Sequence, residues 1–185
     1  MNKKKAIATI CKSHGIGLYQ QANDSTFISN GAVFYNLGKF PWCETEEELA
    51  NVLGLTEKQL QAHTLEIIND NFPFEANRCL SEYQGVLNQT KYKIQSDIRT
   101  MSIFSLNKET VIVDDMFLKP FDDKDKTYEL HEYSMGQKFI KVQYGILTAG
   151  YVLPVKINGK SDECFKEIIS ALTKIKNVEG KNEDV

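Results

Sequence analysis

Residues that could carry catalysis are few in this sequence and stand far apart. The three histidines, His14, His63 and His131, show none of the spacings by which histidines bind a metal ion. Asp114 and Asp115 could form a pair of carboxylates, but adjacent acids at the start of a helix more often cap it. The sequence contains no serine elbow, phosphate-binding loop or dinucleotide fingerprint. It therefore favours a protein that is not an enzyme and carries no cofactor.

Metal binding is also disfavoured by the residues that could provide ligands. The cysteines stand singly, with no Cys-x-x-Cys pair, and are typical of buried small residues or free thiols: Cys11, Cys43, Cys79 and Cys164. The cluster Asp122, Asp123 and Asp125 lacks the glycine and distal glutamate of a calcium loop, so a solvated turn is expected there. We expect no metal site.

Charge is the feature that best indicates binding. The formal net charge is only −3, but residues 1–14 contain no acid and four lysines, Lys3, Lys4, Lys5 and Lys12. These lysines could contact the phosphates of duplex DNA. Residues 41–90 contain nine acids against one lysine and one arginine, and their densest run, Glu46, Glu47 and Glu48, could contact a protein partner. The alternative is that these charges only solvate helix faces.

The pattern of secondary structure is clearest between residues 109 and 158. Thr110–Val113 is predicted to be a strand, and Met116–Leu118 a short helix. Apolar residues then alternate with other residues through Phe139–Ile146 and Tyr151–Ile157, which indicates half-buried strands. We expect a three-stranded antiparallel meander with turns at 134–136 and 148–150.

The first forty residues predict a helix followed by three short strands. Apolar residues at helical spacing indicate a helix over 3–13. Strands are expected at Ile16–Tyr19, Thr26–Ile28 and Ala32–Tyr35, and the pair Asn30-Gly31 predicts a hairpin turn between the last two.

The middle of the chain predicts two helices in succession. Thr45 with Glu48, and Thr56 with Gln59, each form a capping box, and we expect the second helix to reach Ile68. The pair resembles a DNA-reading helix-turn-helix in the placing of its small and apolar residues, but its acidity argues against phosphate contact. A short helix within 77–89 and strands at 91–95 and 99–106 are expected next. A final amphipathic helix is expected at 161–176, before a frayed tail at 177–185.

Composition limits the overall organisation. With 185 residues, 42% hydrophobic and 25% charged, the chain fits a single domain over 1–185, with residues 41–90 as an acidic helical insertion. No apolar run approaches the roughly 18 residues that span a bilayer, and Ala6–Cys11 is too short for a signal-peptide core. We expect an α+β fold of antiparallel sheets with packed helices, a cytoplasmic location and no membrane partner. No internal repeat is visible in the sequence.

Two segments, Val113–Pro120 and Tyr151–Ile157, resemble the last stretch of a bacterial sliding clamp, in which a residue pair enters a short helix and a meander leads to a closing apolar run. The whole chain also resembles small proteins of phages and mobile elements in Gram-positive bacteria. The resemblance implies a DNA-clamp-like domain in which the closing run lines a groove for partner peptides. Carried over to this sequence, that run is Val152, Leu153, Pro154, Val155 and Lys156. The helix expected at 161–176 could fill the same groove.

These observations give one expected function and two alternatives. We expect a non-catalytic, clamp-like accessory to DNA replication that contacts a protein partner and duplex DNA. The first alternative is a phage inhibitor of a host nucleic-acid-targeting defence complex, of the anti-CRISPR type, acting through the acidic segment. The second is a helix-turn-helix transcription regulator. Neither the partner nor the oligomeric state follows from the sequence.

Overall fold

The computed structural model describes residues 1–22, 25–69, 72–74, 81–96, 98–107, 109–121, 125–133 and 136–156. The chain divides into two compact units, Met1–Pro154 and Val155–Val185. The architecture below is that of the first unit, and the single-domain prediction stays a prediction. The expected α+β class with antiparallel sheets is confirmed.

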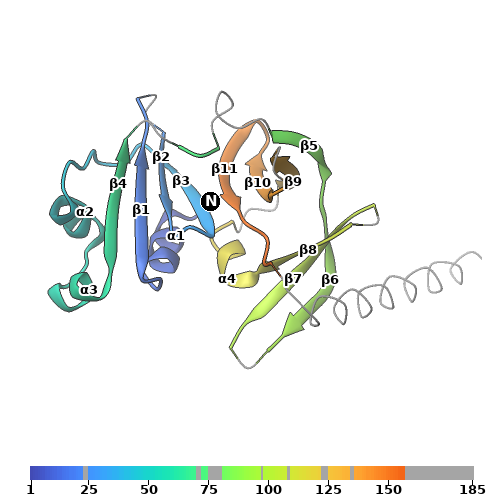
Figure 1. The fold of residues 1–185 in the computed structure, drawn as a ribbon, viewed down its shortest axis with the longest axis horizontal. Coiled ribbons are helices and arrows are strands. Elements are labelled where there is room, and N and C mark those ends of the chain that lie inside the picture. Colours follow the sequence, from blue (N-terminus) through green and yellow to red (C-terminus); the bar gives the residue numbers. More distant parts are fainter. Residues whose placement is uncertain are drawn as a thin grey trace, which may run out of the picture. The chain divides into compact units, whose positions relative to one another are not determined.

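An eight-stranded sheet forms the body of the first unit (Figure 1). Neighbouring strands are antiparallel, except that the edge strand β4 runs parallel to β1. The strands in spatial order are β4 (Thr64–Asn69), β1 (Gly15–Gln20), β2 (Thr26–Ser29), β3 (Val33–Gly38), β11 (Leu147–Val152), β10 (Lys138–Tyr144), β9 (Lys126–Tyr133) and β5 (Ser81–Val86).

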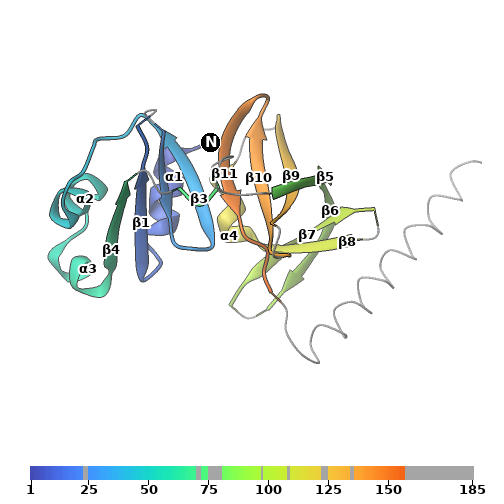
Figure 2. The same ribbon diagram turned by 45° about the horizontal axis from the view of Figure 1, so that its top comes forward.

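The sheet consists of two halves with the same order of elements. The first half is helix α1 (Lys3–Ile10) followed by the meander β1-β2-β3, and the second is helix α4 (Asp115–Leu118) followed by the meander β9-β10-β11. The halves join where β3 pairs with β11, with Phe34 opposite Tyr151 and Val33 opposite Val152. Figure 2 shows the two meanders on either side of this junction. The structure therefore contains a repeat that the sequence does not display.

The two helices cover the same face of the sheet and share one core. Ala6 and Ile10 of α1 are fully buried with Tyr35 and Leu118 in a single cluster. The Asn2 N–H donates to the Pro120 carbonyl at 2.9 Å, and the Tyr35 hydroxyl donates to the Phe117 carbonyl at the same distance. The helix predicted at 3–13 is confirmed over 3–10, and the short helix after Val113 is confirmed as α4.

The opposite face of the sheet is aromatic. Phe27, Phe34, Phe139 and Tyr151 come from four neighbouring strands and pack in one cluster. The segment 72–74 lies on them, between β4 at one edge of the sheet and β5 at the other. The ring of Phe72 stacks on Phe27 with a centroid distance of 4.0 Å, and Phe74 stacks on Tyr151 at 4.4 Å. Phe72 thus contacts rings of both halves, because it also approaches Tyr151 at 5.6 Å.

A smaller antiparallel sheet of three strands follows β5. It contains β6 (Asn88–Gln95), β7 (Thr100–Leu106) and β8 (Glu109–Asp114), in that order. Phe104 is fully buried and meets the Tyr128 ring of β9 edge-on, with centroids 4.9 Å apart. The three strands predicted for this region are confirmed.

Both capping boxes are confirmed, but the second helix is much shorter than expected. Thr45 with Glu48 caps α2 (Glu46–Leu53), and Thr56 with Gln59 caps α3 (Glu57–Ala62). The predicted continuation of the second helix to Ile68 was wrong, because Thr64–Asn69 forms β4. Pairing with β1 buries Leu65 there, so tertiary contact overrides helical spacing. That α2 and α3 form an insertion stays a prediction.

Three further expectations about local structure were wrong. The helix expected within 77–89 is contradicted by β5, although residues 75–80 lie outside the described part of the chain. The turn expected at 148–150 lies inside β11, and the actual turn is at Gly145 and Ile146, where Gly145 has φ +58°. The closing strand ends at Val152 rather than continuing to Ile157.

The helix predicted at 161–176 and the tail at 177–185 lie outside the described residues, as do Asp122, Asp123, Cys79 and Cys164. Within the described ranges, no helix combines the length and hydropathy needed to cross a bilayer.

Candidate functional site

The start of α1 is basic, and it lies on the face of the sheet that α1 and α4 cover, called the helical face below. Asn2 caps the helix by accepting a hydrogen bond from the Lys5 backbone at 3.1 Å, and Lys3, Lys4 and Lys5 form its first turn. All three lysine side chains are exposed, whereas Lys12 is exposed beyond the opposite end of the helix. Backbone N–H groups at a helix start already carry partial positive charge, so lysines there do not stabilise the helix. The arrangement suits an anion such as a phosphate.

The fold adds one cation to this group that sequence reasoning missed. Lys119 is the C-cap of α4 and is exposed. Because the Asn2 backbone bonds to Pro120, the start of α1 lies beside the end of α4. The sequence signal was present, since Lys119 directly follows the predicted short helix, but its proximity to Lys3 depends on contacts between distant segments.

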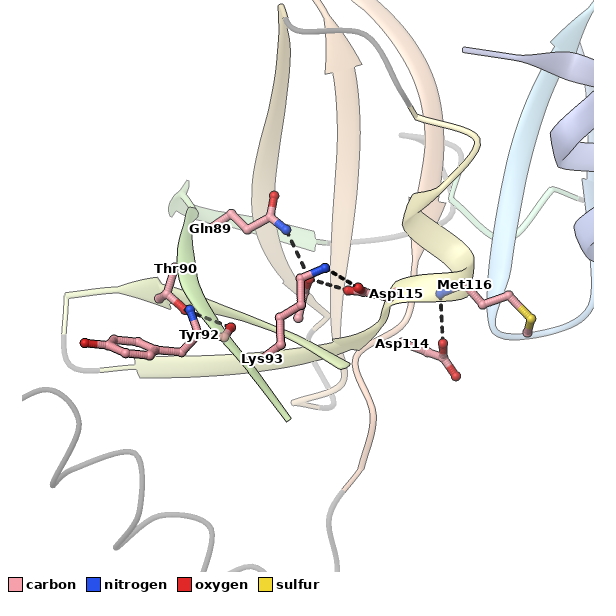
Figure 3. Close-up of polar contacts among 8 residues, drawn as sticks. Gln89, Thr90, Tyr92, Lys93, Asp114, Asp115 and Met116 are labelled. Carbon is pink, nitrogen blue, oxygen red and sulfur yellow. Dashed lines mark hydrogen bonds and ion pairs between the residues drawn. The ribbon is translucent and has the colours of Figure 1, made fainter. Parts of the chain in front are cut away.

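The start of α4 has the opposite chemistry. Asp114 is the N-cap and accepts a hydrogen bond from the Met116 backbone at 2.9 Å, as the adjacent acids predicted. The Asp115 carboxylate accepts hydrogen bonds from the Ser102 hydroxyl and the Lys93 ammonium group. Figure 3 shows Lys93 and Asp115 directed toward each other, with Asp114 turned toward the helix backbone.

This polar network is structural. Ser102 is only 1% exposed, and its hydroxyl both donates to Asp115 and accepts a hydrogen bond from Gln89 at 3.0 Å. Because the Ser102 side chain is buried and its hydroxyl already forms two hydrogen bonds, the hydroxyl is not accessible from the surface. The network ties β6 and β7 to the first residue of α4.

The closing run, residues 152–156, includes the point in the sequence at which the chain divides into its two compact units. Val152 is fully buried, and Leu153 is half-buried against the aromatic cluster while its N–H donates to the Ala32 carbonyl at 2.8 Å. These two residues belong to the core and offer little surface to a peptide. Pro154 and Val155 are half-buried and Lys156 is exposed, and their role in partner binding stays a prediction.

The acidic run at the start of α2 contains two kinds of residue. Glu46 and Glu47 are exposed in the first turn. The Glu48 carboxylate instead accepts hydrogen bonds from the backbone of Glu44 and Thr45, at 2.7 and 3.3 Å. Glu48 is therefore a capping residue, whereas Glu46 and Glu47 remain available to a partner.

His14 and His63 lie on adjoining segments, because the Thr64 N–H donates to the His14 carbonyl at 2.8 Å and the His14 ring approaches the Ala62 carbonyl at 3.4 Å. His63 ends α3, and its ring lies between the carbonyls of Gln59 and Cys11, which links α3 to the end of α1. His131 on β9 approaches the Glu129 carboxylate at 3.3 Å. Burial raises the pKa of the Cys11 and Cys43 thiols, which keeps them protonated and poorly reactive. Within the described residues, no three His, Cys, Asp or Glu side chains are grouped to hold a metal ion.

The helix-turn-helix arrangement has little support in this geometry. None of the six residues of α3 is buried, and the chain passes from α3 through His63 into β4. A recognition helix is normally held by packing against its neighbours.

Comparison of this chain with protein-family models, curated proteins and solved structures gives no match. Inferences about its function therefore rest on its sequence and its geometry.

Proposed function

We propose that this chain is a clamp-like, non-catalytic binding protein that serves DNA replication in a phage or mobile element. In this proposal the helical face contacts duplex DNA, and other surfaces contact protein partners. The proposal extends the resemblance of Val113–Pro120 and Tyr151–Ile157 to a sliding clamp.

One observation carries the proposal. The meanders of the two halves form one continuous sheet, joined at the β3–β11 pair. The helix that precedes each meander packs on the same face of that sheet. The clamp resemblance implies helices packed on antiparallel sheets, with a residue pair entering a short helix. In this chain Asp114 and Asp115 occupy that position at α4.

Charge on the helical face supports contact with DNA. Lys3, Lys4 and Lys5 are exposed on α1, and Lys119 is exposed at the end of α4, which the Asn2–Pro120 hydrogen bond places next to the start of α1. Lysines that neutralise phosphates release counterions, so such binding weakens steeply as salt rises. Encircling a duplex would require several copies of the chain, since the first unit has only these two related halves.

Two measurements on the full chain test the proposal. Light scattering after size exclusion gives the oligomeric state, and fluorescence anisotropy gives the affinity for a labelled duplex at about 50 and about 200 mM salt. We expect affinity at low salt that falls at least tenfold at high salt. A monomer that binds no duplex under either condition would refute the clamp-like function and leave the fold unaffected.

A further inference from the structure

Trp42 is the one tryptophan of the chain, and 55% of its surface is exposed. Tryptophan is a large residue that usually buries most of its surface, and it is enriched where proteins bind one another. The neighbouring Cys43 is fully buried, so the core takes up Cys43 and leaves Trp42 exposed.

The backbone next to Trp42 is held by hydrogen bonds from a buried side chain, Gln20. Gln20, which is 1% exposed on β1, donates to the Cys43 carbonyl at 2.7 Å and accepts from the Cys43 N–H at 2.8 Å. The same Gln20 amide also donates to Asn69 on β4 at 3.1 Å. A buried polar side chain thus fixes the loop on two strands of the sheet. An aromatic residue presented on a fixed backbone loses little conformational entropy when it binds.

The charge around Trp42 determines the kind of partner. Glu44, Glu46 and Glu47 follow within five residues and are all exposed. In the part of the chain that the structure describes, no lysine or arginine forms an ion pair with any of the three. Nucleic acid would be repelled by these carboxylates, whereas a guanidinium group could stack on the indole and pair with a carboxylate at the same time.

We propose that Trp42, together with Glu44, Glu46 and Glu47, forms a docking surface for an arginine-bearing segment of a protein partner. Glu48 is not part of this surface, because its carboxylate caps α2. The proposal does not depend on the clamp-like function, since the surface comprises the loop before α2 and the first turn of α2 and includes none of the lysines of α1.

Because Trp42 is the chain's single tryptophan, its fluorescence reports on this surface alone. The probe is a synthetic peptide of repeated Arg-Gly-Gly, titrated into the full chain at low salt. We expect saturable quenching of the Trp42 emission, with the matching Lys-Gly-Gly peptide binding several-fold more weakly because lysine cannot stack as a plane. An oligothymidylate of similar length should leave the emission unchanged.

Variants separate this surface from the general acidity of the chain. Glu44→Gln, Glu46→Gln and Glu47→Gln together should weaken arginine-peptide binding at least tenfold. The control, Glu57→Gln, Glu66→Gln and Glu82→Gln, makes the same change in net charge at other exposed sites and should bind within twofold of the parent chain. Trp42→Ala, followed by calorimetry, should also weaken binding at least tenfold without changing the thermal midpoint, because the side chain is exposed.

Equal losses in the two triple variants would overturn the proposal, since the peptide would then respond only to overall charge. Quenching by oligothymidylate but not by the arginine peptide would overturn it as well, because the surface would then bind bases. A Trp42→Ala variant that folds and binds normally would exclude the aromatic contact.

Discussion

The two halves of the eight-stranded sheet share an order of elements but use charge at their helix starts in opposite ways. In the first half, α1 begins with Lys3, Lys4 and Lys5, exposed at the positive end of the helix dipole. In the second half, α4 begins with Asp114 and Asp115, whose carboxylates bond to the helix backbone, Ser102 and Lys93. The second arrangement stabilises the fold, and the first does not.

This difference separates residues that maintain the structure from residues that the proposed function assigns to DNA binding. The carboxylates of the second half hold the small sheet against α4, so changing them should cost stability. The lysines of the first half do not complement the dipole of the helix that they begin, so changing them should affect binding more than stability. The predictions below test this division, from the largest expected effect to the smallest.

Phe72→Ala should have the largest effect, because this ring contacts aromatic residues of both halves. Phe72 is 2% exposed and packs against Phe27, Phe34 and Tyr151. Truncating a buried phenylalanine should lower the free energy of unfolding by about 3–5 kcal/mol, measured by urea denaturation. The control is Ile146→Ala, at a side chain 96% exposed, which should change stability by less than about 0.5 kcal/mol. A small loss for Phe72→Ala would mean that the aromatic segment does not hold the halves together.

Asp115→Ala should cost about 2–3 kcal/mol, because it leaves the buried Ser102 hydroxyl without its acceptor and Lys93 without its partner. Lys93→Ala should cost less than about 1 kcal/mol, since that side chain is 51% exposed. Chemical denaturation of both variants gives the comparison. If Lys93→Ala costs as much as Asp115→Ala, the ion pair matters more than the buried hydrogen bond.

Alkaline pH should destabilise the protein through its buried tyrosines. Burial raises the pKa of Tyr35 on the first half and of Tyr128 on the second above the ordinary value of 10.0. In the unfolded chain both ionise near pH 10, whereas in the folded chain both stay neutral. The stability is therefore complete below pH 10 and falls as pH rises above it, by up to about 1.4 kcal/mol per pH unit for each tyrosine. Urea midpoints at pH 8, 10 and 11 measure the fall.

Tyr35→Phe serves as the control for this pH dependence. It should lose about 1 kcal/mol at neutral pH, because the Tyr35 hydroxyl donates to the Phe117 carbonyl. Above pH 10 its stability should fall less steeply than that of the parent chain. An unchanged slope in Tyr35→Phe would show that this tyrosine does not remain neutral in the folded protein.

The parts of the fold that could be predicted from the sequence depend on neighbouring residues. The two capping boxes, the Asn30-Gly31 turn and the Asp114 cap all follow from short-range hydrogen bonds, and each is present. Strands of the two meanders follow from alternation. These features are set within a few residues and need no knowledge of the fold.

The rest depends on contacts between segments far apart in the chain. Thr64–Asn69 is a strand because β1 accepts it as a parallel neighbour, which helical spacing at Leu60 and Thr64 concealed. Phe72 carries no local signal of its role, since Phe27 and Tyr151 come from distant strands. The candidate site also depends on distant contacts. The lysines of α1 were predicted from the sequence, but the end of α4 with Lys119 lies next to them only because Asn2 bonds to Pro120. Val152, which the sequence placed at a partner-binding groove, is fully buried in the core.

The smallest expected effect on stability belongs to the lysines of α1. Replacing Lys3, Lys4 and Lys5 together with glutamine should leave the free energy of unfolding unchanged or raise it by no more than about 1 kcal/mol, because positive charge is removed from the positive end of the helix. Thermal and urea denaturation check this, and a marked destabilisation would show that the lysines have a structural role.

The same triple variant tests the central claim, that the helical face of this chain contacts DNA. The affinity for a duplex is measured at four salt concentrations for the parent chain and the variant, and log K is plotted against log salt. The claim predicts weaker binding by the variant and a slope reduced by about 1 for each lysine that contacts a phosphate. Identical slopes and affinities for the two proteins would contradict it.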